Sequence, residues 1–443
     1  MTTARENELL TRVGPGTPMG ALMREYWIPV AQSDEVQADG DPLRLMALGE
    51  PLIAFRDTSG RLGVLDHRCP HRCASLFFGR NEQNGIRCIY HGWKFDVEGN
   101  CLEMANVPPH QDFKDKIKAK AYRTTERYGV IWLYMGDRAE APPFPDFELN
   151  DLKGDDVSVR IIQQEYNWLQ GLENDLDTSH FGFLHLGGVD PAAMVPGDTL
   201  TQLATDRTPQ FHIEDTPLGL MYGAHRPADA ANTHWRLAQF ILPFWVIPPA
   251  AMLADQIMMK GYIPMDDTHT LVITINRAGM SRMRTRLRSG AEIPGLGTSA
   301  IAGIEYLPNS TDWFGRWRLV NNAGNDYLID REAQRHGGVF SGIFGLTVQD
   351  AAIGGMLGPI SDRTRETLTP SDAMIARMRH KLIRLVDAFA KDKSTKLPGV
   401  DDPGIYRGHR AGNFVAANGK PFREAYAEQM RQHANAAPRW AAE

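Results

Sequence analysis

The chain has 443 residues, of which 42% are hydrophobic and 23% are charged. One hydrophobic core seldom fills a chain of this length, so the sequence predicts two domains. Its formal net charge of −6 provides no bulk attraction to nucleic acid or to an anionic membrane, and neither partner is expected.

Composition also bears on location. The longest apolar run, residues 240–254, contains three prolines and is too short to span a bilayer, so it is read as buried strand and turn. Four cysteines in this length form no disulfide framework and fit a reducing compartment. The N-terminal residues lack the charged-then-apolar pattern of a signal peptide. We therefore expect a cytoplasmic protein.

Short β-rich runs separated by turns fill the first part of the chain, between about residues 26 and 135. The runs are residues 43–48, 52–56, 61–66, 86–90 and 128–135. This pattern predicts a small antiparallel β-domain. The proline-rich segment 141–145 is typical of a domain boundary. We therefore place an N-terminal helix and the β-domain in residues 1–140, and a second domain in residues 150–443.

Two short motifs in the β-domain pair a cysteine with a histidine: Cys69 with His71, and Cys88 with His91. This is the ligand set of a Rieske [2Fe–2S] cluster, in which the cysteines hold one iron and the histidines hold the other. A structural zinc site is the alternative, although zinc fingers usually group cysteine with cysteine and histidine with histidine. The remaining cysteines, Cys73 and Cys101, lack such partners and are expected to be ordinary buried thiols.

Strand-like runs alternate with a few helices in the second part of the chain. The runs are residues 157–164, 210–214, 218–222, 234–241, 256–264 and 268–276. They predict an α+β domain built on an antiparallel sheet. A helix is expected after the capping segment 369–372, with apolar residues from 374 to 389 at helical spacing. Between these elements, residues 281–303 begin with four arginines in eight positions and are predicted to be a mobile loop.

A second metal site is predicted in the segment 167–185, where His180 and His185 are five residues apart. Two histidines and a distant carboxylate form the facial triad of non-haem Fe(II) oxygenases, which leaves positions open for O₂. An unbroken helix aligns residues four apart, so Gly182 is expected to supply a break or bulge. Asp350 is the preferred third ligand and Asp362 is the alternative. A helix-capping or surface role is the simpler explanation of either carboxylate.

With these motifs, the chain resembles the α subunits of Rieske non-haem iron oxygenases, and it is similar to the phthalate dioxygenase family over nearly its whole length. The supporting segments are residues 8–20, the two cysteine–histidine motifs, residues 167–185, and residues 358–364 with Glu366. The resemblance implies a Rieske domain followed by a catalytic domain of helix-grip type. It also implies a homotrimer or a hexamer of stacked trimers.

The same resemblance implies how electrons reach the iron. A separate NADH-dependent reductase with flavin and a [2Fe–2S] cluster would supply them, and the cluster of one subunit would reduce the mononuclear iron of its neighbour. Asp177 matches the carboxylate that bridges a cluster histidine and an iron-binding histidine. Asn174, in the same segment, is a further catalytic candidate. Arg207 and Arg236 are the candidates for binding a substrate carboxylate.

The leading hypothesis is a dioxygenase, similar to phthalate 4,5-dioxygenase, that converts an aryl carboxylate with O₂ to a cis-dihydrodiol. One alternative keeps the metal chemistry but makes the enzyme a monooxygenase that demethylates or cleaves an aryl ether. Another is a Rieske electron carrier, against which the second domain argues. The last alternative is a self-sufficient NADH oxidoreductase. Against it, the glycine-containing segment 295–300 lacks the preceding strand of a dinucleotide-binding fingerprint.

Overall fold

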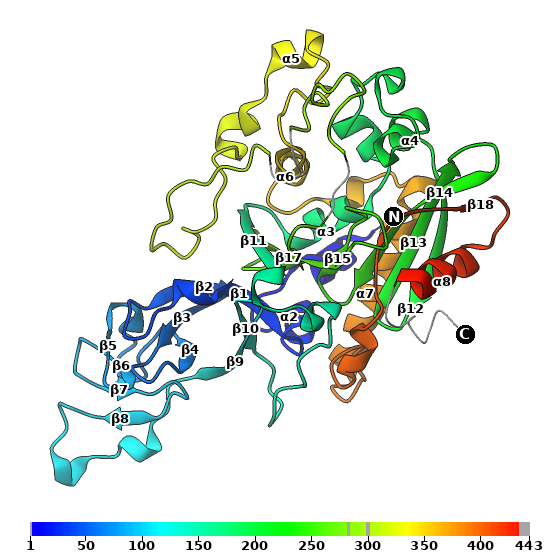
Figure 1. Ribbon diagram of the computed structural model, residues 1–443. Helices are drawn as coiled ribbons and strands as arrows, with labels where there is room; N and C mark the ends of the chain where they lie inside the picture. The colour runs from blue at the N-terminus through cyan, green and yellow to red at the C-terminus, as the bar shows by residue number, and fades with distance from the viewer. Residues whose placement is uncertain (1, 281–283, 298–301, 434–443) are drawn as a thin grey trace.

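The computed structural model describes residues 2–280, 284–297 and 302–433. Figure 1 shows two unequal parts, with the blue and cyan β-domain at one end and the larger domain, green to red, at the other. Residues 281–283 and 298–301 of the predicted loop lie outside the described residues. Among the described residues, no helix has the length and apolar character needed to cross a membrane.

Two antiparallel sheets build the first domain. The six-stranded sheet has the order β1-β10-β9-β4-β3-β2, and the four-stranded sheet has the order β5-β6-β7-β8. Their strands are β1 (Ile28–Gln32), β2 (Leu43–Ala47), β3 (Glu50–Arg56), β4 (Leu62–Asp66), β5 (Arg80–Glu82), β6 (Gly85–Arg87), β7 (Lys94–Phe95), β8 (Cys101–Glu103), β9 (Ala121–Arg127) and β10 (Val130–Tyr134). The sheets enclose a small core that includes Phe55, Ile86 and Phe95, and the loops bearing Cys69 and Cys88 pack on it.

The second domain is built on an eight-stranded antiparallel sheet, in which seven strands follow the order β11-β17-β16-β15-β14-β13-β12 and the eighth, β18, pairs with β14 beside this path. One edge of β14 is shared, since its first half pairs with β18 and its second half with β15. The strands are β11 (Val157–Gln164), β12 (Gln210–Thr216), β13 (Gly219–Pro227), β14 (Asn232–Ile241), β15 (Trp245–Ile247), β16 (Met258–Pro264), β17 (Thr270–Arg277) and β18 (Gly412–Ala417). The predicted α+β class with antiparallel sheets in both domains is confirmed.

The helices of the described chain are α1 (Ala4–Thr11), α2 (Pro18–Met23), α3 (Trp168–Leu176), α4 (Thr199–Thr205), α5 (Arg331–His336), α6 (Leu346–Met356), α7 (Ala373–Lys391) and α8 (Phe422–His433). Of these, α3 and α7 contact strands of this sheet, and α4 and α6 contact the segment 181–185. As predicted, α7 buries a periodic apolar face that includes Met378, Leu382 and Val386. A 3₁₀ turn, Pro370–Asp372, precedes this helix, so the predicted start lies in the turn rather than in α7 itself.

The N-terminal helices pack on the second domain, although the sequence groups them with the first. Both α1 and α2 contact α7. The Asn7 side chain donates a hydrogen bond to the Ser361 carbonyl at 3.1 Å, and it accepts one from Arg363 at 3.2 Å. Arg363 is fully buried and pairs with Glu173 of α3 at 2.9 Å. The first residues of the chain thereby support the helix that leads to the metal-binding segment.

Candidate metal centres

Cys69 and Cys88 occupy two matching tight turns after β4 and β6. The amide of Cys73 donates to the carbonyl of Cys69 at 2.8 Å, and the amide of Gly92 donates to that of Cys88 at 3.0 Å. Each turn contains a residue with positive φ, 58° at Cys73 and 77° at Gly92. This conformation favours glycine and orients both turns in the same way. Both ligand cysteines are buried.

The two imidazoles of these motifs lie together. The ring centroids of His71 and His91 are 4.5 Å apart, and His71 stacks on Trp93 at 4.4 Å. The Nδ1 atom of His91 is buried and has no hydrogen-bond partner among the described residues. Burial raises the pKa of the Cys69 thiol to about 12, so this residue needs a bound metal to hold it as a thiolate. The four side chains fit a metal cluster.

The remaining two cysteines differ in their environment. Cys101 is buried in the first domain, as expected. Cys73 is exposed, and the expectation of a buried thiol is wrong for it. The reason is local, because Cys73 closes the turn that begins at Cys69 and adopts the left-handed conformation.

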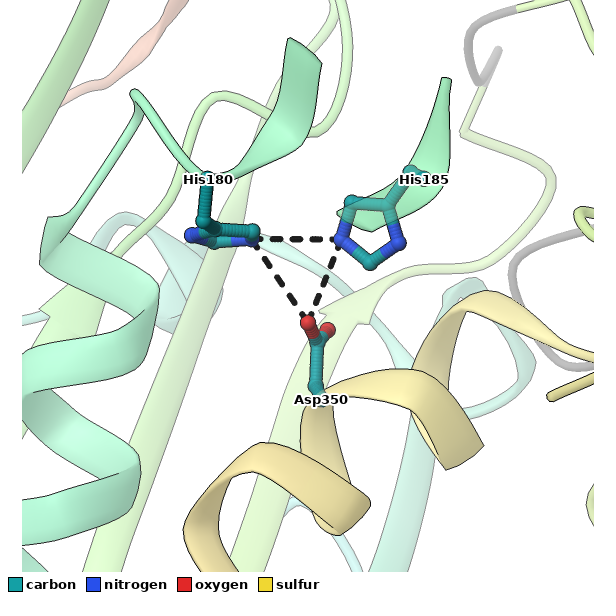
Figure 2. Close-up of side chains that lie close together, drawn as sticks. All are labelled: His180, His185 and Asp350. Carbon is teal, nitrogen blue, oxygen red and sulfur yellow. Dashed lines mark hydrogen bonds and ion pairs between the residues drawn. The ribbon is translucent and has the colours of Figure 1, made fainter. Parts of the chain in front are cut away.

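His180, His185 and Asp350 form a compact triad in the second domain (Figure 2). The Nε2 atoms of the two histidines are 3.2 Å apart, and Oδ1 of Asp350 is 3.2 Å from His185 Nε2 and 3.6 Å from His180 Nε2. Ligand atoms about 2.1 Å from one metal ion and at right angles to each other lie about 3.0 Å apart. The triad therefore has the spacing of three ligands on one face of a metal ion.

The alternative carboxylate, Asp362, has a different task. It caps the 3₁₀ turn Arg363–Arg365, where its Oδ1 accepts from the Thr364 amide at 3.1 Å and from the Thr364 hydroxyl at 2.6 Å. Within the described parts of the chain, Asp350 of α6 is the carboxylate that joins the two histidines.

A π-helical turn, Phe181–His185, explains the five-residue spacing of the histidines. A π-turn brings residues five apart onto one side, as an α-helix does for residues four apart. Gly182 has an ordinary φ, and a Cβ at this position would lie 3.0 Å from the Arg207 side chain and 3.2 Å from the Leu203 carbonyl. The glycine therefore permits close packing against the segment after α4, rather than a left-handed break.

Charge favours metal binding by this triad. Burial raises the pKa of Asp350, but the nearby His185 and His180 lower it further, to about 2, so the carboxylate is ionised at neutral pH. Burial and the neighbouring His185 lower the pKa of His180, which leaves it a neutral imidazole. Oδ1 of Asp350 and Nδ1 of His180 are buried without hydrogen-bond partners among the described residues. A cation between these groups would satisfy the carboxylate.

Gln349, which the sequence did not point to, orients His185. Its side-chain oxygen accepts a hydrogen bond from His185 Nδ1 at 2.5 Å, and its amide group donates to the carbonyls of Ile343 and Gly295 at 2.7 and 3.2 Å. The two donated bonds fix the direction of the amide. The proton of His185 is therefore on Nδ1, and the lone pair of Nε2 faces the other ligands.

Replacing Gln349 by leucine is expected to weaken metal binding by about 10- to 100-fold, the range for the loss of such a supporting partner. Titration of the iron-free protein with Fe(II) or Co(II) measures the affinity. Gln349→Glu keeps an oxygen that accepts from His185, so its affinity should lie closer to that of the unchanged protein. Equal affinity of the leucine variant and the unchanged protein would remove Gln349 from the site.

Asp177 lies at the C-terminal end of α3, next to the triad. Its Oδ2 is 3.8 Å from His180 Nδ1, and its Oδ1 accepts from the Ser179 amide at 2.7 Å. Its side chain is one-quarter exposed, so it faces both the histidine and the surface. Asn174 is buried one turn earlier in α3, and its carbonyl accepts from the Asp177 amide at 3.2 Å. The side chain of Asn174 does not line the cavity beside the triad.

A cavity of about 190 Å³ adjoins the triad. It is lined by apolar side chains such as Phe181, Leu200 and Met258, and by the cationic side chains of Arg160, Arg236 and Lys260. The sequence pointed to Arg236 but not to Arg160 or Lys260. Lys260 Nζ pairs with Asp175 Oδ2 at 2.6 Å, so its charge is balanced within the cavity wall.

Of the two arginines predicted to bind the substrate, the structure places only one at the cavity. Arg236, on β14, lines the cavity, donates to Thr178 Oγ1 at 2.8 Å and to the Pro249 carbonyl at 3.1 Å, and is 5% exposed. Burial lowers its pKa to about 10, so it remains charged at neutral pH. Arg207 does not line the cavity. Its guanidinium lies 4.9 Å from the ring of Phe183, because the chain after α4 runs behind the π-helical turn.

Comparison with known proteins defines the class. Residues 26–118 match the family model of the Rieske [2Fe-2S] domain, and residues 133–289 and 297–436 match that described as LigXa C-terminal domain like. The chain belongs to the Rieske non-haem iron oxygenases, as an oxygenase subunit. It therefore binds a [2Fe–2S] cluster in its first domain and uses a mononuclear non-haem iron in its second, which excludes the zinc interpretation.

Among its relatives is the 3-chlorobenzoate-3,4-dioxygenase oxygenase subunit of Comamonas testosteroni, 43% identical over 97% of this chain and 99% of the relative. The phthalate 4,5-dioxygenase oxygenase subunit of Pseudomonas putida is 36% identical, with 89% and 88% covered. The 5,5'-dehydrodivanillate O-demethylase oxygenase subunit of Sphingobium sp. (strain NBRC 103272 / SYK-6) is 31% identical, with 91% and 85% covered.

Solved structures share the fold. NdmA of Pseudomonas putida CBB5, a QL mutant with theobromine, has a TM-score of 0.56 at 16% identity and covers 91% of this chain and 99% of its own. Dicamba monooxygenase bound to dicamba has a TM-score of 0.54 at 16% identity, with 83% and 98% covered. Identities this low show the fold alone.

Proposed function

We propose that this oxygenase hydroxylates an aromatic carboxylate with O₂ to a cis-dihydrodiol. Cys69, His71, Cys88 and His91 would hold the cluster, and His180, His185 and Asp350 would hold Fe(II). The observation that carries the proposal is the buried, charged Arg236 beside the triad, in a cavity that also presents apolar side chains such as Phe181, Leu200 and Met258. The relatives named for 3-chlorobenzoate and phthalate support the same substrate class.

Each part of the cavity has a physical role in this proposal. The planar guanidinium of Arg236 would bind the carboxylate, whose charge it matches, and so orient the ring toward the triad. Phe181, Leu200 and Met258 would contact the ring and exclude water. Bound iron would supply the activation of O₂. Arg207 is not included among the proposed substrate-binding residues, since it lies behind the π-helical turn.

Electrons are proposed to come from a separate NADH-dependent reductase that carries flavin and a [2Fe–2S] cluster. The names of the relatives support a multicomponent system, because both dioxygenases and the O-demethylase are called oxygenase subunits. We further propose a homotrimer or stacked trimers, in which Asp177 bridges the two metal centres of neighbouring subunits. The partly exposed position of Asp177 beside His180 is consistent with that role.

Demethylation of an aryl ether is the second candidate function. It is favoured by the 31% identity to an O-demethylase oxygenase subunit over 91% of this chain. The same cavity would then place a methoxy group near the triad while Arg236 holds a carboxylate elsewhere on the ring. The products separate the two reactions, since a dihydrodiol retains both atoms of O₂ whereas demethylation releases formaldehyde and a phenol.

The test is a panel of benzoates, phthalates and methoxybenzoates, assayed on the iron-loaded protein with a surrogate reductase under ¹⁸O₂. We expect turnover of ring carboxylates and a product that carries two ¹⁸O atoms. The matching aromatic compounds without a carboxylate should be poor substrates. Turnover that is indifferent to the carboxylate would overturn the proposed substrate class, and formaldehyde release would favour the demethylase.

Arg236 and Arg207 provide matched variants for this assay. Arg236→Lys keeps a charge but loses the fork, and Arg236→Met loses both. A charged hydrogen bond contributes roughly 1.5–3 kcal/mol, so the KM of the methionine variant should rise about 10- to 150-fold. Arg207→Met, outside the cavity, should leave KM nearly unchanged. A larger effect from Arg207 than from Arg236 would reverse the assignment.

A further inference from the structure

Residues 305–320 form a hairpin that leaves the second domain and reaches the first. Its arms are paired by a bridge between Tyr306 and Leu319, and the Leu307 amide donates to the Arg318 carbonyl at 2.9 Å. The tip is tightly closed, because a Cβ on Gly315 would lie 2.2 Å from Ser310 Oγ. In Figure 1 the hairpin is the yellow-green loop that runs past β11 toward β2. Contacts within the hairpin therefore fix its conformation.

The second domain holds this hairpin along β11 and at the β16–β17 turn. The amide of Gln163 donates to the Trp317 carbonyl at 2.8 Å, and the Gln163 side chain donates to the Phe314 carbonyl at 2.8 Å. The ring of Phe314 stacks on His269, with centroids 3.9 Å apart. Backbone and side-chain contacts thus fix the tip to the sheet of the second domain.

The tip also contacts the first domain at charged and aromatic groups. Arg316 forms an ion pair with Glu35, in which the side chains are 9% and 13% exposed. Arg44 of β2 donates to the Thr311 carbonyl at 2.6 Å. The guanidinium of Arg44 is 3.8 Å from the ring centroid of Phe77 and 5.2 Å from that of Trp313.

Trp313 extends these contacts to the first cluster loop. Its ring meets His67 edge-on, with centroids 5.2 Å apart. His67 closes the loop that carries Cys69 and His71, because its carbonyl accepts from the Leu76 amide at 2.6 Å and its neighbour Arg68 bridges to Ser75. One side chain of the second domain therefore contacts the base of a loop that holds half of the proposed cluster ligands.

We propose that Trp313 is a positioning residue for the cluster, and that the hairpin holds the loop of Cys69 and His71 in place relative to the second domain. Loops are the least stable parts of a domain, and a cluster that is to reduce the iron of a neighbouring subunit must keep a fixed place in its own subunit. An anchored aromatic contact at the base of the loop limits its movement without occupying a ligand position.

The test is Trp313→Ala in the full-length, iron-loaded protein. Hydrogen exchange at the amides of residues 69–76 should be about tenfold faster, because the loss of one aromatic contact favours local opening. The iron content and the melting temperature should change little, while the Rieske EPR signal should broaden. A further readout rests on the proposed function: the reduced cluster should be oxidised more slowly in a single turnover with substrate and O₂.

Two control variants distinguish positioning from general support. Trp313→Phe keeps a ring against His67 and should restore slow exchange and a narrow EPR signal. Glu35→Gln weakens the hairpin at a site away from the cluster loop and should leave exchange at residues 69–76 unchanged. The proposal is overturned if Trp313→Ala exchanges like the unchanged protein, or if Glu35→Gln opens the cluster loop as much. If exchange rises but oxidation of the cluster does not slow, Trp313 positions the loop without limiting electron transfer. A reduced cluster that substrate and O₂ fail to oxidise in the unchanged protein would instead contradict the proposed function.

Discussion

Asp350→Ala should yield a protein that keeps the Rieske EPR signal but loses its mononuclear iron. The iron content is expected to fall from about three atoms per chain to about two. The physical reason is the loss of the only carboxylate in the triad, which leaves two imidazoles 3.2 Å apart with no anionic ligand to balance the charge of the metal. Hydroxylation should fall by more than the roughly 10- to 100-fold typical of losing a supporting partner.

The matched control for this experiment is Asp362→Asn. Asp362 caps a 3₁₀ turn through the Thr364 amide and hydroxyl, and asparagine caps as well as aspartate. Iron content and turnover should therefore be retained. If Asp362→Asn lost the mononuclear iron and Asp350→Ala kept it, the choice of carboxylate would be wrong. Metal analysis together with EPR shows which carboxylate binds the mononuclear iron, and neither measurement needs a substrate.

Asp177→Asn is expected to retain both metal centres and yet lose turnover by about 100-fold, the upper end of the range for groups that orient a metal ligand. An amide is nearly the same shape as a carboxylate but lacks its charge, and it cannot accept from two imidazoles through two equivalent oxygens. Single-turnover kinetics of the reduced protein should show that oxidation of the cluster, rather than substrate binding, is the slowed step.

Asp190→Asn serves as the control for Asp177→Asn. Asp190 is an exposed aspartate that caps the 3₁₀ turn Pro191–Ala193 by accepting from the Ala192 amide at 2.9 Å, a role that asparagine can fill. The turnover of the Asp190→Asn variant should match that of the unchanged protein. Full activity of Asp177→Asn would remove the bridging role, whereas loss of iron in that variant would assign Asp177 to metal binding instead.

Local spacing made much of the site predictable. The pairs Cys69 with His71 and Cys88 with His91 are motifs whose members are a few residues apart, so the sequence displays them directly. The five-residue gap between His180 and His185 indicated an irregular helix, and the structure has a π-turn there. The structure also brings Asp350 to the histidines, as expected, although its role as a ligand stays a prediction.

Contacts between residues that are far apart in the sequence limited what could be predicted about the site and the fold. Gln349, Arg160 and Lys260 reach the site from α6, β11 and β16, and nothing in their local sequence marks them. Arg207 and Arg236 looked equivalent as arginines near predicted strands, but only the fold determines that β14 faces the cavity and the segment after α4 does not. The short strand β18 was missed because six residues carry little periodicity, and β15 lies inside the apolar run 240–254, which was read as buried strand and turn without the bounds of the strand.

The packing of α1 and α2 on α7 has a consequence for how the chain acquires its structure. Residues 4–23 are synthesised well before residues 373–391, against which they rest. The β-domain between them can complete its own hydrogen bonds early, but the larger domain must wait until residues 373–391 have been made. Its final assembly is therefore a long-range event that joins two segments made at widely separated times.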